Sequence, residues 1–167
     1  MSTGLAPAIF AGDFVDVHQQ RVVAVDASRA GPALEAFVDA LGTGSLRLRA
    51  PVWLPNLGAA IELRDDVVVT LIKTAREGAT GCAGVTWFGS HDGPFPRLHG
   101  QLWLEPATTW TSTLRFDARY RQMPSTLRLS ASAEGMIGHR IILATARLLL
   151  RDVANALEAE PLMPPAE

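Results

Sequence analysis

The 167-residue chain has one cysteine, one lysine and one tyrosine, and these shortages narrow what it can do. A single cysteine, Cys82, excludes an intrachain disulfide and a zinc site built from four cysteines. Charged residues make up only 19% of the chain, and the formal net charge is −2. Because nucleic-acid binding needs a basic patch or stripe, this composition predicts no nucleic-acid partner.

Long apolar runs are also missing. No stretch approaches the roughly 20 apolar residues that a membrane-spanning helix needs, so we expect no integral membrane segment. The opening "MSTGLAPAIFAG" has no positively charged start and only a short apolar run. It therefore does not resemble a secretory signal, and the sequence predicts a cytoplasmic protein.

Catalytic and metal-binding signatures are absent from the sequence. The segment "GSHDG" (89–93) places a serine, a histidine and an aspartate side by side, whereas a catalytic triad is assembled in space from separated residues. The segment "GATGCAG" (78–84) lacks the glycine spacing of a phosphate-binding loop. The four histidines are scattered without metal-ligand spacing: His18, His91, His99 and His139. We therefore predict no metal and no cofactor.

What the chain does have is apolar residues, at 48% of its length, which is enough for one domain with a proper core. The boundaries suggested by composition are a flexible N-terminus at 1–12, one domain at 13–160 and a disordered tail at 161–167. The segment "EPLMPPAE", with three prolines in eight residues, is the reason for ending the domain near 160.

The pattern inside this domain predicts an α+β layout. Residues 28–42 should form a short helix that ends at Gly42, with Ser28 as a candidate N-cap, although Pro32 suggests a start a few residues later. Residues 43–58 carry prolines and glycines and are predicted to form a loop. Residues 59–78 should form two strands joined by a hairpin turn at Asp65–Asp66. Further strands are expected at 14–27, 81–90, 97–106, 108–122 and 125–133, and a long closing helix at 138–160.

Two segments show their buried faces clearly. In 108–122 the alternation predicts one covered face, made by Trp110, Leu114, Phe116, Ala118 and Tyr120. In the closing helix a 3.6-residue period aligns one apolar row, made by Ile142, Ala146, Leu149, Val153 and Leu157. In 97–106 we expect the leucines to point inward and Trp103 to point outward as a partly exposed aromatic.

This order of elements resembles the START-like helix-grip superfamily, which includes the Bet v 1 allergens, lipid-transfer START domains and polyketide cyclases. The resemblance rests on three segments. The segment "RVVAVDASRAGPALEAFVDAL" looks like the first strand and helix of that superfamily, and "HGQLWLEPATTWTSTLRFDARY" looks like its late strands. The segment "GHRIILATARLLLRDVANALEAE" looks like its closing helix. The resemblance implies a curved antiparallel sheet of six to seven strands wrapped around that helix.

The resemblance also implies a cavity between the sheet and the helix. His139, at the edge of the apolar row, could reach the mouth of such a cavity, although a histidine there is more often a surface or satisfied core residue. The residues expected to line the cavity are Leu71, Phe88, Leu102, Leu114, Phe116, Tyr120, His139, Ile142, Ala146 and Leu149.

Three functions follow from this reading. The first is binding or carriage of a small hydrophobic molecule such as a lipid, polyketide or aromatic metabolite. The second is a cyclase or dehydratase that uses the same cavity, with His139 or Tyr120 as general acid or base. The third is a protein-interaction module, which predicts a solid core and a large apolar surface patch. The sequence leaves the ligand, and the formation of a homodimer, open.

Overall fold

The computed structural model describes residues 14–42, 46–48, 51–54, 59–62, 67–89, 97–121 and 131–159, of which 51–54, 59–62, 89 and 131–138 are described by their backbone alone. The expected flexible N-terminus at 1–12 and tail at 161–167 lie outside the described residues. The elements are β1 (Phe14–Val23), α1 (Ala27–Leu41), β2 (Leu46–Leu48), β3 (Pro51–Leu54), β4 (Ala59–Glu62), β5 (Val67–Thr74), β6 (Gly81–Gly89), β7 (Leu98–Pro106), β8 (Ser112–Arg121) and α2 (Ala131–Ala159).

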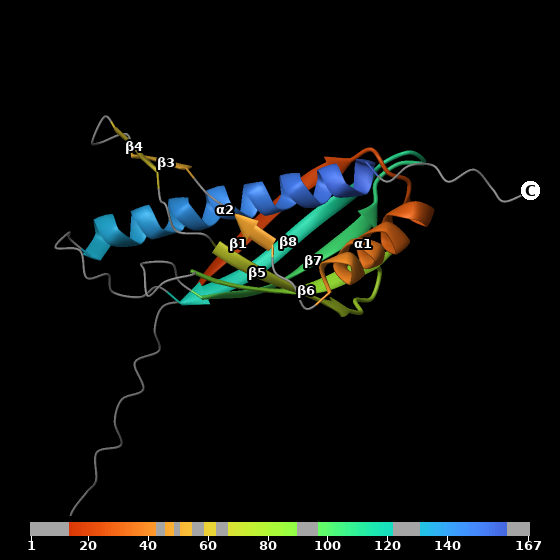
Figure 1. Cartoon of the computed structure of the whole chain (residues 1–167), viewed down its shortest axis with the longest axis horizontal. Helices are drawn as coiled ribbons and strands as arrows, with labels where there is room; N and C mark the ends of the chain where they lie inside the picture. The colour runs from red at the N-terminus through yellow and green to blue at the C-terminus, as the bar shows by residue number, and fades with distance from the viewer. Residues whose placement is uncertain are drawn as a thin grey trace, which may run out of the picture.

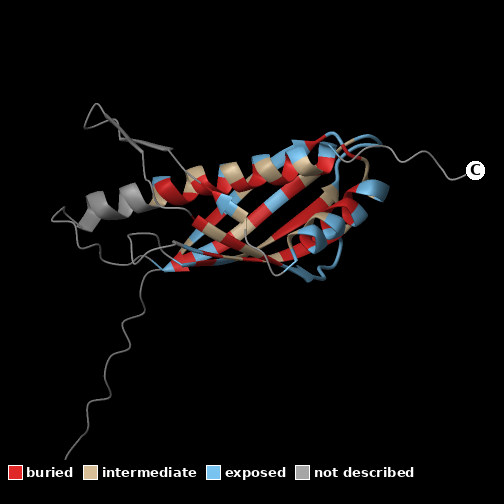
Figure 2. Ribbon diagram, in the orientation of Figure 1, coloured by how far each residue is buried: buried red, intermediate tan, exposed pale blue. Residues whose placement is uncertain are grey.

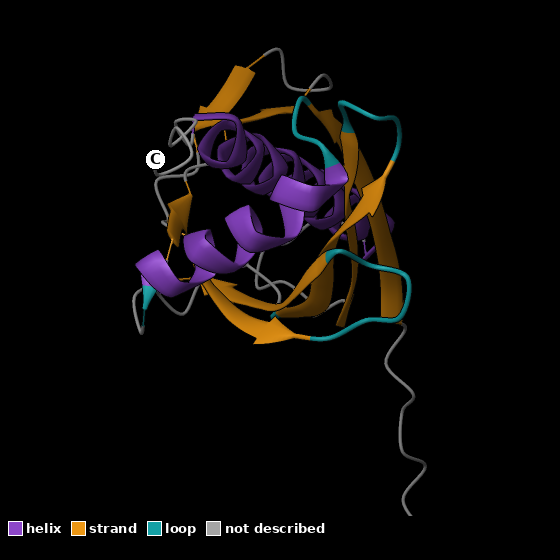
Figure 3. Ribbon diagram, turned by 90° about the vertical axis from the view of Figure 1, so that its right-hand side faces the viewer, coloured by secondary structure: helices purple, strands orange, loops and turns teal. Residues whose placement is uncertain are grey.

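Six of the strands form one antiparallel sheet in the order β1-β8-β7-β6-β5-β2, and β3 and β4 pair separately. The sheet curves around the two helices, and α2 runs along its concave side (Figures 1 and 3). This confirms the predicted α+β helix-grip architecture. It also gives the sheet an inner face toward α2 and an outer face.

The core lies between the inner face and α2. The predicted apolar row of α2 is confirmed, since all five of its members, from Ile142 to Leu157, are buried. Figure 2 shows buried residues on the side of α2 that faces the sheet and a mixture of intermediate and exposed residues on its other side. In β8 the alternation is equally regular, because Leu114, Phe116, Ala118 and Tyr120 are buried while Arg115 and Arg119 are exposed.

Helix α1 begins one residue before the predicted cap, and it does not start near Pro32, which lies inside the helix. Asp26, not Ser28, is the N-cap, and its Oδ1 accepts from the backbone N–H groups of Ser28 at 3.0 Å and Arg29 at 3.1 Å. The Asp26 carboxylate thus pairs two backbone N–H groups that have no partner within the helix, and for this reason Asp26 is the N-cap instead of Ser28. Gly42 ends the helix as predicted, with a positive φ of 57°.

α1 packs closely against the start of β6 through two glycines. A Cβ on Gly31 would lie 1.9 Å from the carbonyl oxygen of Thr80, and one on Gly81 would lie 2.9 Å from the Cα of Gly31. No side chain fits between these two backbones. The pair of glycines therefore sets how closely α1 approaches the sheet.

Four further predictions about local structure were wrong. The segment 43–58, predicted to be a loop, contains the strands β2 and β3. The strands on either side of Asp65–Asp66 do not pair with each other as a hairpin would. Instead, β4 pairs with β3, and β5 pairs with β2 and β6. Residues 63–66 and 122–130 lie outside the described residues, and 131–133 belong to α2 instead of a strand. Trp110 is not on the covered face of β8. It lies in the turn before that strand, where Thr108 Oγ1 accepts from its backbone N–H, and it is 77% exposed.

Candidate functional site

Four ring-bearing side chains from three elements meet on the inner face, and we call them the inner aromatic layer: Trp87 of β6, Phe116 and Tyr120 of β8, and His139 of α2. The rings of Trp87 and Phe116 stack with centroids 5.7 Å apart, and those of Tyr120 and His139 with centroids 6.2 Å apart. Trp87 and Tyr120 both pair with Leu98 of β7, so they belong to one row across the sheet.

A glycine makes the stacking of Trp87 on Phe116 possible. Gly100 lies on β7 between Leu98 and Leu102, which are the partners of Trp87 and Phe116 on the adjacent strands. A Cβ on Gly100 would lie 2.5 Å from the Cβ of Ala118 and 2.4 Å from the carbonyl oxygen of Asp117. Because no side chain stands between them at this point, the two large rings can meet across the middle strand.

The indole N–H of Trp87 has no hydrogen-bond acceptor among the described residues, although the side chain is 0% exposed. Leaving a buried donor unpaired costs about 1–3 kcal/mol, and native structures contain few such groups. The inner aromatic layer therefore contains one polar atom whose hydrogen-bonding capacity the described residues do not use.

Tyr120 and His139, by contrast, form a hydrogen bond with each other. The hydroxyl of Tyr120 lies 3.0 Å from Nδ1 of His139. Burial raises the pKa of Tyr120, so this hydroxyl keeps its proton at neutral pH and donates to Nδ1 whenever that nitrogen carries none. The pair is the place in the inner layer where a proton could be exchanged.

The structure brings together nine of the ten predicted lining residues. Eight belong to the buried core cluster, and His139 joins them through Tyr120. Phe88 is the exception, because it lies on the outer face and is 43% exposed. Its neighbour Trp87 takes the inner position instead. A shift of one residue along a strand reverses the face, which is why Phe88 was selected and Trp87 missed.

Other predictions concern the outer face. Trp103 points outward as predicted, but it is buried there, because the guanidinium of Arg76 lies 3.7 Å from its ring centroid. Its indole N–H donates to Glu105 Oε1 at 2.9 Å. Trp103 is therefore covered by its own neighbours and does not form the partly exposed aromatic that the sequence suggested.

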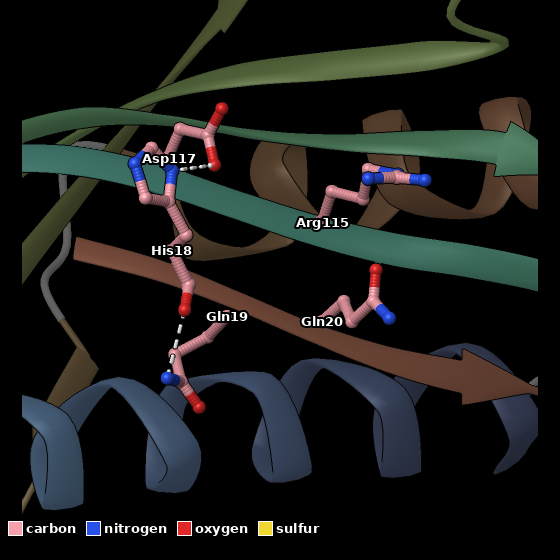
Figure 4. Close-up of a pocket in the computed structure, with 5 residues that line it drawn as sticks. All are labelled: His18, Gln19, Gln20, Arg115 and Asp117. Atoms are coloured by element: carbon pink, nitrogen blue, oxygen red, sulfur yellow. Dashed lines mark hydrogen bonds and ion pairs between the residues drawn. The ribbon is translucent and has the colours of Figure 1, made fainter.

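Two hollows of about 350 and 330 Å³ lie on the outer face, and His18 and Asp117 line both. The two side chains join across β1 and β8, with His18 Nδ1 2.7 Å from Asp117 Oδ1, as the close-up of the first hollow shows (Figure 4). Asp16 and Arg119 form a second cross-strand pair at 2.7 Å. Because the polar groups in these hollows bond one another and are open to water, the outer face is a weaker candidate for binding than the inner layer.

The pairing of His18 gives a pH prediction. The hydrogen bond that the His18 ring donates to the Asp117 carboxylate, together with the negative charge of Asp117, raises the pKa of His18, a side chain that is 71% exposed. The stabilisation from this pair is present below the unfolded-state pKa of histidine and is lost as the pH rises through the raised value.

In an NMR titration we expect the His18 ring to titrate above pH 6.5, and Asp117→Asn to lower that midpoint. Asp39→Asn, which removes the partner of Lys73, should leave the midpoint unchanged. Equal midpoints in the wild type and Asp117→Asn would contradict the pairing.

Neither a cluster of metal-binding side chains nor a helix that could cross a membrane occurs among the described residues. No three His, Cys, Asp or Glu side chains there come together in a way that could hold a metal ion. Neither α1 nor α2, in the part of the chain that is described, is both long and apolar enough to cross a membrane.

Comparisons with known proteins identify the fold through structure alone. No family model and no curated protein matches the sequence. Among solved structures, the Zhui aromatase/cyclase from Streptomyces sp. R1128 matches with a TM-score of 0.54 and 9% identity, over 87% of this chain and 94% of that one. Norcoclaurine synthase from Thalictrum flavum, solved in complex with dopamine and hydroxybenzaldehyde, matches with a TM-score of 0.52 and 12% identity, over 96% of this chain and 97% of that one.

Proposed function

We propose, from the premise that this chain has the START-like, Bet v 1-like helix-grip fold, that it binds a small hydrophobic molecule between the sheet and α2. The site would be made by the inner aromatic layer and the apolar row of α2. Binding there would remove apolar surface of the ligand from water, and the few polar groups would orient it. A cytoplasmic location remains the prediction made from the sequence.

The inner aromatic layer is the observation that carries this proposal. Aromatic rings offer large apolar surfaces that stack on other planar groups, and the chain places four rings on one side of its sheet. The two named neighbours are an aromatase/cyclase and a synthase solved with two aromatic compounds. Their names favour a ring-containing ligand over a long acyl chain.

A second function, an enzyme of the cyclase or dehydratase type, is favoured by the hydrogen bond between Tyr120 and His139. A phenol and an imidazole in contact could move a proton to or from a bound molecule, and the apolar surroundings would hold that molecule in a folded pose. Turnover that disappears in His139→Ala and persists in His18→Ala would favour this function over carriage.

The interaction-module reading has less support. Among the described residues, the exposed large apolar side chains come from several elements, with Phe14 and Val22 on β1, Ile72 on β5, Phe88 on β6 and Trp110 in a turn. Cross-strand pairs such as His18–Asp117 and Asp16–Arg119 occupy the outer face near β1. This scattered arrangement differs from the large continuous patch that a docking module needs.

The proposal predicts that filling the inner layer weakens binding. Ala146 is fully buried on the sheet-facing side of α2, so Ala146→Leu adds volume where the ligand is proposed to lie. We expect the wild type to bind 2-ethylnaphthalene, an uncharged two-ring probe, at one molecule per chain. Isothermal titration calorimetry should show about tenfold weaker binding in the variant, which corresponds to roughly 1.4 kcal/mol.

The matched control is Ala159→Leu, the same change at the exposed end of α2. It should bind the probe as the wild type does, and thermal unfolding should show that both variants are folded. No binding by the wild type, or equal affinity in the two variants, would contradict a site between the sheet and α2.

A further inference from the structure

We infer that the indole N–H of Trp87 is a polar anchor for the ligand, and that the ligand is an uncharged, ring-containing molecule with a carbonyl or ether oxygen that accepts this hydrogen bond. The inference rests on the proposed function and adds to it the chemistry of the ligand. It starts from the one buried side-chain nitrogen that has no partner among the described residues.

The indole N–H of Trp87 is unusual here, because the other polar groups within the described core have hydrogen-bond partners. Ser112 Oγ donates to the carbonyl oxygen of Val25 at 2.7 Å, and Thr145 Oγ1 donates to that of Ile141 at 2.9 Å. The indole of Trp103 donates to Glu105, and Tyr120 bonds His139. The described residues thus pair these groups internally and provide no acceptor for the Trp87 donor.

The chemistry of an indole fixes what its partner must supply. The N–H group donates and cannot accept, so the ligand must provide a lone pair. One face of the Trp87 ring is stacked on Phe116, whereas the N–H points outward in the plane of the ring, so an oxygen has to approach along the ring edge. A flat molecule with an oxygen at its rim meets both conditions.

The preferred charge of the ligand follows from the side chains buried around Trp87. Among the described residues, no Lys, Arg, Asp or Glu side chain is buried. A carboxylate placed beside Trp87 would lose its hydration, and no buried Lys or Arg among the described residues would compensate for this cost. A carbonyl or ether oxygen loses much less water on entering, so a neutral acceptor is preferred to a fatty acid or another organic acid.

Three naphthalenes that differ in one substituent test this inference: 2-acetylnaphthalene supplies a carbonyl, 2-ethylnaphthalene replaces it with a methylene, and 2-naphthoate carries a charge. With ¹⁵N-labelled protein, each of the four tryptophans gives one indole N–H signal, and Trp87→Phe identifies that of Trp87. We expect 2-acetylnaphthalene to move the Trp87 signal downfield, and 2-ethylnaphthalene to move it much less. The signal of the exposed Trp110 should stay in place with both.

Affinities provide a second readout. The wild type should prefer 2-acetylnaphthalene to 2-ethylnaphthalene by about three- to tenfold, the worth of one ordinary hydrogen bond, and should bind 2-naphthoate least. Trp87→Phe keeps an aromatic ring and removes the donor, so it should bind the two neutral probes equally.

The outcomes separate this inference from the proposed function. Equal affinity for the two neutral probes in the wild type, with an unmoved Trp87 signal, would overturn the anchor and leave the apolar site standing. Preference for 2-naphthoate would overturn the neutral-ligand assignment. Failure of all three probes to bind would contradict the proposed function itself. If Trp87→Phe does not fold, the wild-type comparison of the neutral probes decides alone.

Discussion

Replacing Phe116 with alanine is expected to lower the free energy of unfolding by about 3–5 kcal/mol, the usual cost of removing a fully buried phenylalanine. Phe116 is completely covered on the inner face of β8, and it also stacks on Trp87. Urea unfolding followed by tryptophan fluorescence measures the change. Since small domains are stable by only about 5–15 kcal/mol, this variant should lie close to the unfolding threshold.

Phe88→Ala is the matched control, with the same substitution on the next-to-last residue of β6. Phe88 is on the outer face, so its removal should change stability by no more than about 1 kcal/mol. A loss of similar size in both variants would mean that the inner and outer faces have been assigned wrongly. A loss below about 1 kcal/mol in Phe116→Ala would contradict its place in the core.

Gly31→Ala is expected to destabilise the protein by about 1–3 kcal/mol or more, although alanine is the better helix former. Helix propensity alone would favour alanine by roughly 1 kcal/mol. The steric effect is larger here, because the new Cβ would stand 1.9 Å from the carbonyl oxygen of Thr80, a backbone atom that cannot rotate away. Thermal and urea unfolding both report the loss.

Gly84→Ala controls for the general effect of replacing a glycine. A Cβ there would lie 3.4 Å from Thr74 Cγ2, close to an ordinary contact and against the end of a side chain. We expect the stability of this variant to stay within about 1 kcal/mol of the wild type. A stabilising effect of Gly31→Ala would show that α1 does not pack on β6 as closely as described.

The parts of the fold that could be predicted are those in which a long periodic pattern coincides with one-sided burial. The apolar row from Ile142 to Leu157 and the alternation from Leu114 to Tyr120 both have enough repeats to fix the buried face. The meander of β5, β6, β7 and β8 could then be expected from consecutive strands with short connections, whereas the pairing of β1 with β8 and of β2 with β5 could not. The short strands β2 and β3 have too few residues for a pattern, and the prolines and glycines of the surrounding segment 43–58 indicated a loop instead.

The candidate site was harder to predict, because its key contacts depend on the relative positions of several strands. Trp87 could be placed on the same face as Val85 from sequence, yet its stacking on Phe116 requires Gly100 to lie between them on β7. The lack of an acceptor for its N–H is likewise a property of the folded core. Tyr120 and His139 were both predicted to line the site, but the bond between them joins residues from β8 and α2.

Native mass spectrometry of the protein purified from its own source, followed by a denaturing run that releases bound molecules, tests the proposed ligand site most directly. The account predicts one small molecule per chain, uncharged, with at least one ring and an oxygen that can accept a hydrogen bond. A bound organic acid would contradict the assignment of a neutral ligand. A chain that carries nothing from its source and takes up none of the three naphthalenes would contradict the ligand-binding function.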